Sequence, residues 1–247
     1  MRIWPIALLL VTAMASSTAV FADDIEVSFS HFKAIPASAS SQDWNPDAPW
    51  LIPEGFRQSV VSDESTLNIY PEGVSDWYDM NAVNESGPMP GRFLYRTHEV
   101  RCGAPWAVYP LCSRYPGGAV SVVDLQTGVA TIMVQDPSYQ ALDGIRWTPW
   151  ASLLVVEEVE GGRLLEISLD AKDLTKGVVH DRPAAGRLAH EGVDVGPDGA
   201  VYVVDEYRGL SEQCPDGSLP CGGGIYRFVP EKWGDLSSGE LFVLAVS

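Results

Sequence analysis

From residue 58 onward, hydrophobic residues occur in short runs of four to seven positions that are unbroken or alternate with polar residues. Turn-forming stretches separate these runs, among them GPMPG, YPGG, DLQTG, EGG, GPDG and CGGG. Alternation with a period of two and frequent turns are typical of β-strands joined by tight connections. This part of the chain shows no convincing amphipathic helix. The pattern therefore predicts an all-β domain.

One sequence pattern recurs three times in this domain: an apolar strand that closes on an acidic pair or on His-Glu, a loop, two glycines and a second strand. The copies are LYRTHE (94–99) with GGAVSVVDL, LLVVEE (153–158) with GGRLLEISL, and VYVVDE (201–206) with GGIYRFV. The copies start 59 and 48 residues apart. Repeats of about this length are typical of propeller blades, in which each small sheet packs against its neighbours. We predict a β-propeller, complete or partial, over residues 58–247.

Alignment of the three copies places polar residues in two tiers. One tier holds His98, Glu157 and Asp205, and the next holds Glu99, Glu158 and Glu206. Equivalent strand ends converge near the axis of a radial repeat, so these carboxylates are expected to lie close together. Clustered carboxylates repel one another unless a cation lies among them. The repeat therefore also predicts a metal site.

Two of the four histidines precede a glutamate, in the pairs His98-Glu99 and His190-Glu191. Successive residues of a strand face opposite sides of the sheet, so both members of a pair reach one site only at a bulge. Each histidine is as readily a core or orienting residue as a ligand. We therefore favour the glutamates as site residues, and the pair at 190–191 adds Glu191 to those of the repeat.

The N-terminal 22 residues have the features of a secretory signal peptide: Arg2, an apolar run over 6–15 and a small-residue end at 20–22. The apolar run is too short to span a bilayer, and no later run is long enough. The protein is therefore expected to be periplasmic or secreted, with no membrane span.

Two further segments stand apart from the repeat. Residues 23–57 are rich in Ser, Ala, Pro and Trp without a clear period, which predicts an irregular N-terminal arm. The sequence ends on the apolar ELFVLAVS (240–247), with no turn or polar tail. We expect the propeller domain to be truncated at its C-terminus, or else closed by a means that the sequence does not show.

Composition narrows the range of partners. The formal net charge of −17 disfavours binding to nucleic acid and to anionic lipid. It is compatible with cations held by carboxylates, although most of the 33 acidic residues are expected to form a solvated surface. We therefore expect a small-molecule substrate and no nucleic-acid partner.

The four cysteines fit an oxidising compartment. Their spacing favours local disulfides, Cys102 with Cys112 and Cys214 with Cys221, because each pair flanks a Pro- and Gly-containing loop. Four cysteines allow three connectivities. A four-thiolate zinc site is disfavoured because it requires closer spacing.

No GxSxG, P-loop or HExxH motif is present, which weakens the serine hydrolase, nucleotide-binding and zincin hypotheses. Three arginines, Arg96, Arg146 and Arg208, lie near the acidic strand ends. An arginine beside clustered acids either balances their charge or binds a phosphate or carboxylate in bidentate fashion. Arg146, in DGIRWTPW (143–150), is our candidate for the second role.

Several of these stretches together resemble the PhoX family of alkaline phosphatases and its bacterial relatives. They are THE (97–99), DGIRWTPWASLLVVEE (143–158), GRLAHEG (186–192), VYVVDE (201–206), GGIYRFVP (223–230) and GDLSSGELFVLAV (234–246). The resemblance extends in order from about Pro49 to the end of the chain. It implies a periplasmic or secreted β-propeller that hydrolyses phosphomonoesters with Ca²⁺ and Fe³⁺ held by carboxylates and one cysteine.

The resemblance also implies ligands, and the sequence departs from the family in places. The implied metal ligands are a glutamate of the Glu157-Glu158 pair, Glu191 and Asp205. Asp143 stands where the family has its iron-binding cysteine, and Thr97 replaces the asparagine of an Asn-His-Glu motif. A carboxylate in place of a thiolate favours Ca²⁺, Mg²⁺ or Mn²⁺ over iron. The ligands and the phosphate-binding arginine that the family supplies from later blades have no counterpart here.

We therefore predict a secreted, PhoX-like, calcium-dependent phosphomonoesterase, complete or degenerate. The predicted metal ligands are Glu158, Glu191 and Asp205, supported by Asp143, Glu157 and Glu206. Glu99 and Arg146 are the candidate catalytic residues. Two alternatives stay open: a calcium-dependent lactonase or esterase on the same scaffold, and a non-enzymatic binding or scaffold module stabilised by calcium.

Overall fold

A computed structural model describes residues 35, 45, 50–63, 67, 69–70, 77–103, 107, 109–206 and 223–244, and all structural statements concern these residues. The chain divides into two compact units, residues 1–59 and 60–247. The described part of the first unit contains a turn, in which the Phe56 N–H donates to the Pro53 carbonyl oxygen over 3.2 Å. The predicted signal peptide and most of the predicted arm lie outside the described residues.

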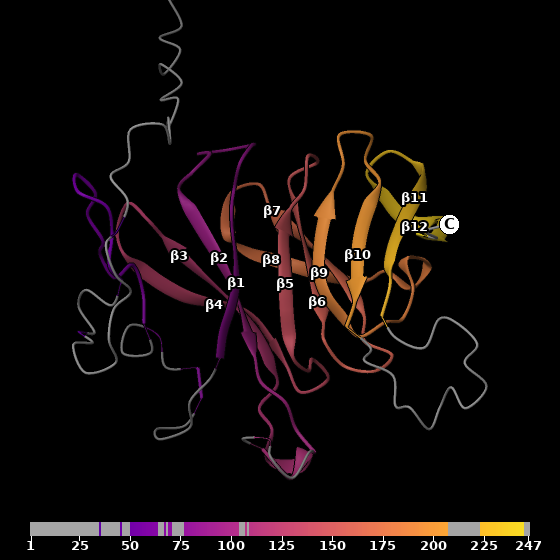
Figure 1. Cartoon of the computed structure of the whole chain (residues 1–247), viewed down its shortest axis with the longest axis horizontal. Coiled ribbons are helices and arrows are strands. Elements are labelled where there is room, and N and C mark those ends of the chain that lie inside the picture. The colour runs from indigo at the N-terminus through magenta and orange to yellow at the C-terminus, as the bar shows by residue number, and fades with distance from the viewer. Residues whose placement is uncertain are drawn as a thin grey trace, which may run out of the picture. The chain divides into compact units, whose positions relative to one another are not determined.

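The second unit is built from antiparallel sheets, which confirms the all-β prediction. Three sheets of four strands follow one another along the chain, and each strand pairs with its sequence neighbours (Figure 1). The first contains β1 (Trp77–Val83), β2 (Phe93–Glu99), β3 (Gly118–Asp124) and β4 (Val129–Asp136). The second contains β5 (Leu142–Trp147), β6 (Ser152–Glu157), β7 (Leu164–Asp170) and β8 (Asp173–Asp181). The third contains β9 (His190–Val195), β10 (Val201–Asp205), β11 (Ile225–Lys232) and β12 (Asp235–Val243). Two short 3-10 helices, η2 (Cys112–Arg114) and η3 (Pro183–Ala185), lie in connections.

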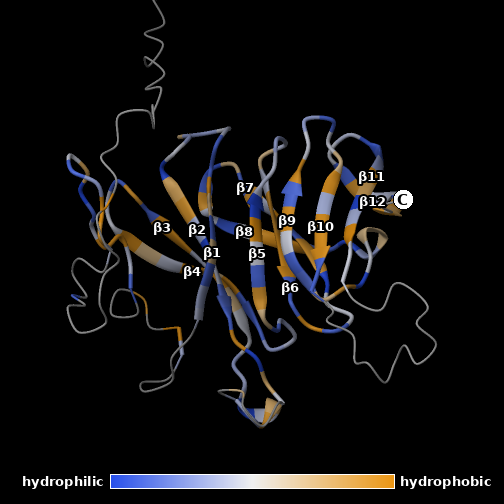
Figure 2. Ribbon diagram, in the orientation of Figure 1, coloured by the Kyte–Doolittle hydropathy of each residue, from blue (hydrophilic) through white to orange (hydrophobic). Residues whose placement is uncertain are grey.

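The position of each strand in its sheet agrees with its hydrophobic pattern. Every residue of β6 is buried, as expected for a strand covered on both faces. The outer strands β4 and β8 consist of exposed and half-buried residues, apart from the buried Leu174 in β8. Figure 2 shows the same contrast, with hydrophobic colouring on β2, β3 and β10. The second strands of the first two sheets therefore lie in the core, whereas β10 alternates buried with exposed residues.

The glycine pair of the repeat has a structural reason in the second sheet. A Cβ atom on Gly162 would lie 2.2 Å from the carbonyl oxygen of Glu157 and 2.8 Å from that of Val159. Such contacts do not occur between real atoms, so only glycine fits where the chain turns from β6 into β7.

Adjacent sheets pack through two hydrophobic cores. In the first core, the Tyr95 ring stacks on Trp147 with ring centroids 6.0 Å apart, and the Tyr95 hydroxyl donates to the Leu174 carbonyl oxygen. The second core joins Leu154 and the rest of that face of the second sheet to the third sheet. The first strands of the three sheets, β1, β5 and β9, lie side by side in that order.

A smaller aromatic cluster of Tyr70, Val100, Tyr109 and Tyr115 lies beside the loop after β2. In the described part of the chain, no helix has the length and apolar character needed to cross a membrane.

Candidate metal centre

The first strand of each sheet has an irregularity at the same place in the repeat. In β1, Tyr78 pairs with His98 and Asn81 pairs with Arg96, so two residues of β1 face one residue of β2. β5 is interrupted in the same way between residues 142 and 145, and β9 between residues 190 and 193. The first extra residue of each bulge is acidic: Asp79, Asp143 and Glu191. Because a bulge re-aims the side chains beside it, three acids are presented at corresponding points of neighbouring strands.

A second set of carboxylates lies at the ends of the second strands. Glu99 is the last residue of β2, and Glu158 and Glu206 directly follow β6 and β10. The Glu158 N–H donates to the carbonyl oxygen of Ala141 over 2.9 Å, and the Glu206 N–H donates to that of Ala189 over 2.8 Å. Each of these alanines lies two positions before the bulge acid of its sheet. The glutamates of the second predicted tier are therefore tied to the strands that carry the bulges.

Backbone contacts hold the bulges close together. The Thr97 hydroxyl, opposite the β1 bulge, donates to the Asp143 carbonyl oxygen over 2.5 Å. Between β5 and β9 the approach is closer still, because a Cβ atom on Gly144 would lie 2.8 Å from the carbonyl oxygen of Glu191. Glycine at position 144 therefore lets the second and third bulges meet.

Three carboxylates form the tightest group. Asp143, Glu158 and Glu191 each offer an oxygen, and these oxygens all lie within 4.8 Å of one another. Asp143 is buried, Glu158 is half-buried and Glu191 is exposed, so the group opens to solvent on the side of Glu191. A set of convergent carboxylate oxygens that is partly open to solvent could hold a metal ion.

The electrostatics of the group favour protonation when no cation is bound. Burial raises the pKa of Asp143 to about 8, and the nearby charges of Asp79, Glu191 and Glu99 add to this effect. Burial, a hydrogen bond with Glu206 and the charge of Glu99 raise the pKa of Glu158 well above its usual range, against the opposing effect of Arg101. Burial and the charges of Glu99 and Glu191 also raise the pKa of Asp79. These acids therefore form one electrostatic cluster, which we call the carboxylate cluster. Its six members are Asp79, Glu99, Asp143, Glu158, Glu191 and Glu206.

Among the described residues, Arg101 is a cation that contacts this cluster. The Arg101 guanidinium donates from Nε to Glu99 Oε1 over 2.9 Å and from Nη2 to Glu158 Oε2. Its Nη1 donates to the backbone carbonyl oxygen of Glu158 over 2.5 Å. Arg101 therefore joins the end of the first sheet to the end of β6.

Glu157 lies outside the group of three, which corrects its assignment as a ligand of that group. Its buried carboxylate accepts from Arg163 Nε over 2.7 Å, from Arg163 Nη2 over 2.6 Å and from the Gln140 N–H over 3.0 Å. Adjacent strand residues face opposite sides, so Glu157 and Glu158 cannot serve the same site. Glu157 is an ion-pair partner between strands.

The rest of the first predicted tier also forms local contacts. Asp205 accepts from the Ala189 N–H over 3.1 Å and is not one of the three converging residues. His98 is buried, with Nε2 2.8 Å from the Ser121 hydroxyl and its ring edge-on to Tyr78. Of the second tier, Glu158 belongs to the group of three, and Glu206 and Glu99 interact with it through a hydrogen bond and through charge, respectively.

Arg146, the predicted anion-binding arginine, lies further along β5. Its guanidinium forms ion pairs with Asp194 over 2.9 Å and with Glu85 over 3.4 Å, and the side chain is 41 % exposed. It lies three positions after Asp143, and its guanidinium is directed at other carboxylates.

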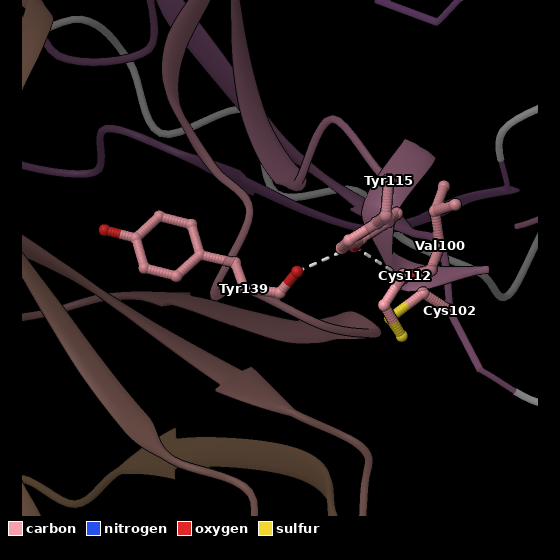
Figure 3. Close-up of a disulfide and its surroundings, with 5 residues drawn as sticks. All are labelled: Val100, Cys102, Cys112, Tyr115 and Tyr139. Carbon is pink, nitrogen blue, oxygen red and sulfur yellow. Dashed lines mark hydrogen bonds between the residues drawn. A yellow bond between two sulfur atoms is a disulfide. The ribbon is translucent and has the colours of Figure 1, made fainter.

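The disulfide between Cys102 and Cys112 is confirmed, and it closes the loop that follows Arg101 (Figure 3). The Tyr115 hydroxyl beside it contacts the carbonyl oxygens of Val100 and Tyr139 at 2.8 and 2.6 Å. A disulfide fits an oxidising compartment. The predicted pair Cys214 and Cys221 lies outside the described residues.

The donors of the cluster suit a hard cation. All are carboxylate oxygens, which Ca²⁺, Mg²⁺ and Mn²⁺ prefer. The described cysteines are both in the disulfide, so the described residues offer no thiolate to iron.

Sequence reasoning missed Asp79 and Arg101. Asp79 lies in WYDMNAV, which lacks the acidic strand end of the repeat, and only the alignment of the first strands of the three sheets would have found it. Arg101 follows Glu99 by two residues, and this proximity was the available signal.

Comparison of the chain with protein-family models and with curated proteins finds no match in either set.

Proposed function

We propose that this protein is an exported, metal-dependent phosphoric monoester hydrolase related to the PhoX-type alkaline phosphatases. The observation that carries the proposal is the convergence of Asp143, Glu158 and Glu191 within 4.8 Å. The sequence stretches that resemble the family include all three residues. A cluster of hard donors is the feature that such an enzyme requires.

We further propose that the three sheets are consecutive blades of a β-propeller. The support is their uniform construction from four antiparallel strands, the succession of β1, β5 and β9, and the bulge that recurs in each. In a propeller, innermost strands surround the axis, which is where ligands commonly bind.

Calcium is the proposed cation. When bound, such an ion polarises a phosphoryl oxygen and lowers the pKa of a bound water. Asp143 would be the buried ligand, Glu158 would be the half-buried one, and Glu191 would be the ligand at the solvent side. Asp143 stands at the position of the family's iron-binding cysteine, and its carboxylate suits calcium better than iron.

The chain's own residues would have separate roles. Asp143 and Glu158, whose pKa values are raised, would release their protons to make room for a cation. Glu99 holds Arg101 in place through an ion pair of 2.8 Å. Thr97 and Gly144 keep the bulges at the distance that the group of three requires.

The presence of Arg101 favours a phosphoester over the lactone that the sequence left as an alternative. A guanidinium in a half-buried site attracts a phosphate dianion, whereas a neutral lactone gains little from it.

Turnover of p-nitrophenyl phosphate, measured with added calcium and with a chelator, tests the proposal. The wild-type protein should hydrolyse the ester only with calcium. Asp143→Asn removes a ligand but keeps the shape of a residue that is protonated without metal, so the variant should fold normally and lose activity. Asp198→Asn is the matched control, because Asp198 pairs with Arg227 on the surface.

Two results decide the outcome. Chelator-sensitive turnover that Asp143→Asn abolishes and Asp198→Asn preserves would support the hydrolase. Absence of turnover in wild-type protein that binds calcium would reject it, and hydrolysis of a lactone under the same conditions would favour the alternative enzyme class.

A further inference from the structure

The guanidinium of Arg101 is the feature of the carboxylate cluster that the metal hypothesis leaves unexplained. Its side chain is 18 % exposed and lies between Glu99 and Glu158, whose side chains are 14 % and 16 % exposed. A cation that occupies two potential ligands competes with a metal ion for them. An arginine at this place therefore needs a role that a metal-binding site alone does not provide.

The backbone that carries Arg101 is fixed independently of the carboxylates. The carbonyl oxygen of Val100 accepts hydrogen bonds from the Tyr115 hydroxyl over 2.8 Å and from the Ala141 N–H over 2.9 Å (Figure 3). On the other side, Cys102 is bonded to Cys112. The backbone on both sides of Arg101 is thus fixed, and the contacts of the guanidinium with Glu99 and with the Glu158 carbonyl oxygen do not involve the Glu158 carboxylate.

A bound metal ion would compete for one of the three hydrogen-bond acceptors of the guanidinium and leave the other two unchanged. A metal ion among Asp143, Glu158 and Glu191 would compete for the Glu158 carboxylate oxygen that now accepts from Nη2. It would not need the Glu158 backbone oxygen that accepts from Nη1, nor the Glu99 oxygen that accepts from Nε. Arg101 would therefore stay beside the cation through these two contacts, while the Nη2 N–H that now donates to the Glu158 carboxylate would be released from it.

A phosphate monoester has the chemistry that fits such a pair of charges. One of its oxygens can bind the cation while others accept from the planar guanidinium. Charge-assisted hydrogen bonds of this kind are stronger than neutral ones, more so in a half-buried site. A monoanionic carboxylate or a neutral ester would use this arrangement less fully.

We propose that Arg101 is the anion-binding residue of the centre and holds the phosphoryl oxygens of a phosphomonoester next to the cation. The inference deepens the proposed function and rests on it. It assigns to Arg101 the role that the sequence suggested for Arg146, whose guanidinium is engaged by Asp194 and Glu85.

Calorimetric titration of inorganic phosphate into the calcium-loaded full chain tests the inference. Arg101→Gln should weaken phosphate binding by at least ~10-fold, because it removes charge-assisted hydrogen bonds. Arg101→Lys keeps the charge without the planar guanidinium, so its phosphate affinity should lie between those of wild type and Arg101→Gln. Arg92→Gln is the matched control, since Arg92 also pairs with a carboxylate, Asp124, but in the first sheet away from the bulges.

Calcium titration of the same variants separates anion binding from a structural role. Loss of Arg101 removes a competing positive charge, so calcium should bind Arg101→Gln as tightly as wild type or more tightly. A merely structural arginine would weaken calcium binding in this variant, and that result would overturn the inference.

The remaining outcomes distinguish the inference from the proposed function. If wild-type protein binds phosphate through Arg101 but turns over no ester, the inference stands and the hydrolase is rejected. If Arg101→Gln keeps wild-type phosphate affinity or hydrolyses the ester with unchanged KM, the inference fails and the hydrolase stands. Absence of phosphate binding by calcium-loaded wild type also overturns the inference.

Discussion

Glu157 and Glu158, adjacent at the end of β6, meet different partners because successive strand residues face opposite sides of a sheet. Glu157 is 3 % exposed and accepts three hydrogen bonds from Arg163 and one from Gln140. Glu158 joins the carboxylate cluster. Within this dipeptide, Glu157 therefore has a structural role and Glu158 is the candidate ligand.

This division predicts opposite effects for the same substitution. Glu157→Gln should destabilise the protein by about 1–3 kcal/mol, because Arg163 would lose its charged partner in a half-buried site, while calcium affinity should change little. Glu158→Gln should cost little stability without metal and greatly weaken calcium binding. Thermal melting and calcium titration of both variants check the prediction, and it fails if Glu157→Gln is the one that loses calcium.

At this scale the sequence predicted part of the site. The alignment of the repeats identified the tier with Glu99, Glu158 and Glu206, and the His-Glu pair added Glu191. Asp79 and Arg101 were missed because their places depend on a bulge in β1 and on a disulfide-closed loop, which are not features of local hydrophobic pattern. Asp205 and Glu157 were expected as ligands because alternation alone does not tell which of the two tiers contributes to the group of three.

At the scale of the element, the bulge in the first strand of each sheet is what brings the acids of the site together. It lies opposite Thr97 in the first sheet and brings Gly144 of β5 against the backbone of β9. Without the extra residue, the acid of each strand would follow the regular alternation and not reach its neighbours. The strands themselves were predictable from their apolar runs. The bulges were not predictable, because they depend on the register in which neighbouring strands pair.

The second residue of the bulge offers a matched pair of glycines. A methyl group on Gly144 would meet the Glu191 carbonyl oxygen and the Val156 Cγ2 at 2.8 Å, whereas one on Gly192, at the equivalent place in β9, would meet nothing within 4 Å. Gly144→Ala should therefore cost about 1–3 kcal/mol and weaken calcium binding by displacing β5 from β9.

Gly192→Ala should leave both properties nearly unchanged. Denaturant unfolding and calcium titration of the two variants provide the comparison. Equal effects of the two substitutions would contradict the account of why the bulges approach one another.

At the scale of the whole molecule, the all-β architecture was predictable because repeats of strand, turn and glycine pair recur along the chain. The packing of one sheet against the next depends on side-chain contacts, such as that of Tyr95 with Trp147. This packing was not predictable from the repeats. The concentration of acids where three sheets meet is a property of this packing. This concentration of acids makes the stability of the metal-free protein depend on pH.

The raised pKa values fix the sign of that dependence. The folded protein keeps the Asp143 proton up to a pH of about 8, whereas the unfolded chain loses it near 3.8, so stability falls as the pH rises toward 8. The acids Asp79 and Glu158 act in the same direction. Burial lowers the pKa of His190 to about 4, which opposes this trend only below its ordinary value of 6.5.

Between pH 6.5 and 8, the melting temperature of the metal-free protein should therefore fall, by roughly 3 °C or more. Saturating calcium should remove most of the fall, because the bound cation replaces the protons. Calorimetric scans with chelator and with calcium measure both curves. A metal-free melting temperature that rises over this range would contradict the assigned pKa directions.

The central claim is that the carboxylate cluster exchanges protons for a hard cation, and calcium titration in buffers of different ionisation enthalpy tests it most directly. Near neutral pH, the account predicts one calcium-binding event with release of about 1–2 protons, since Asp143 and Glu158 are protonated beforehand. Asp143→Asn should lose both the binding and the proton release. Calcium binding without proton release, or no binding by the folded wild-type protein, would contradict the account.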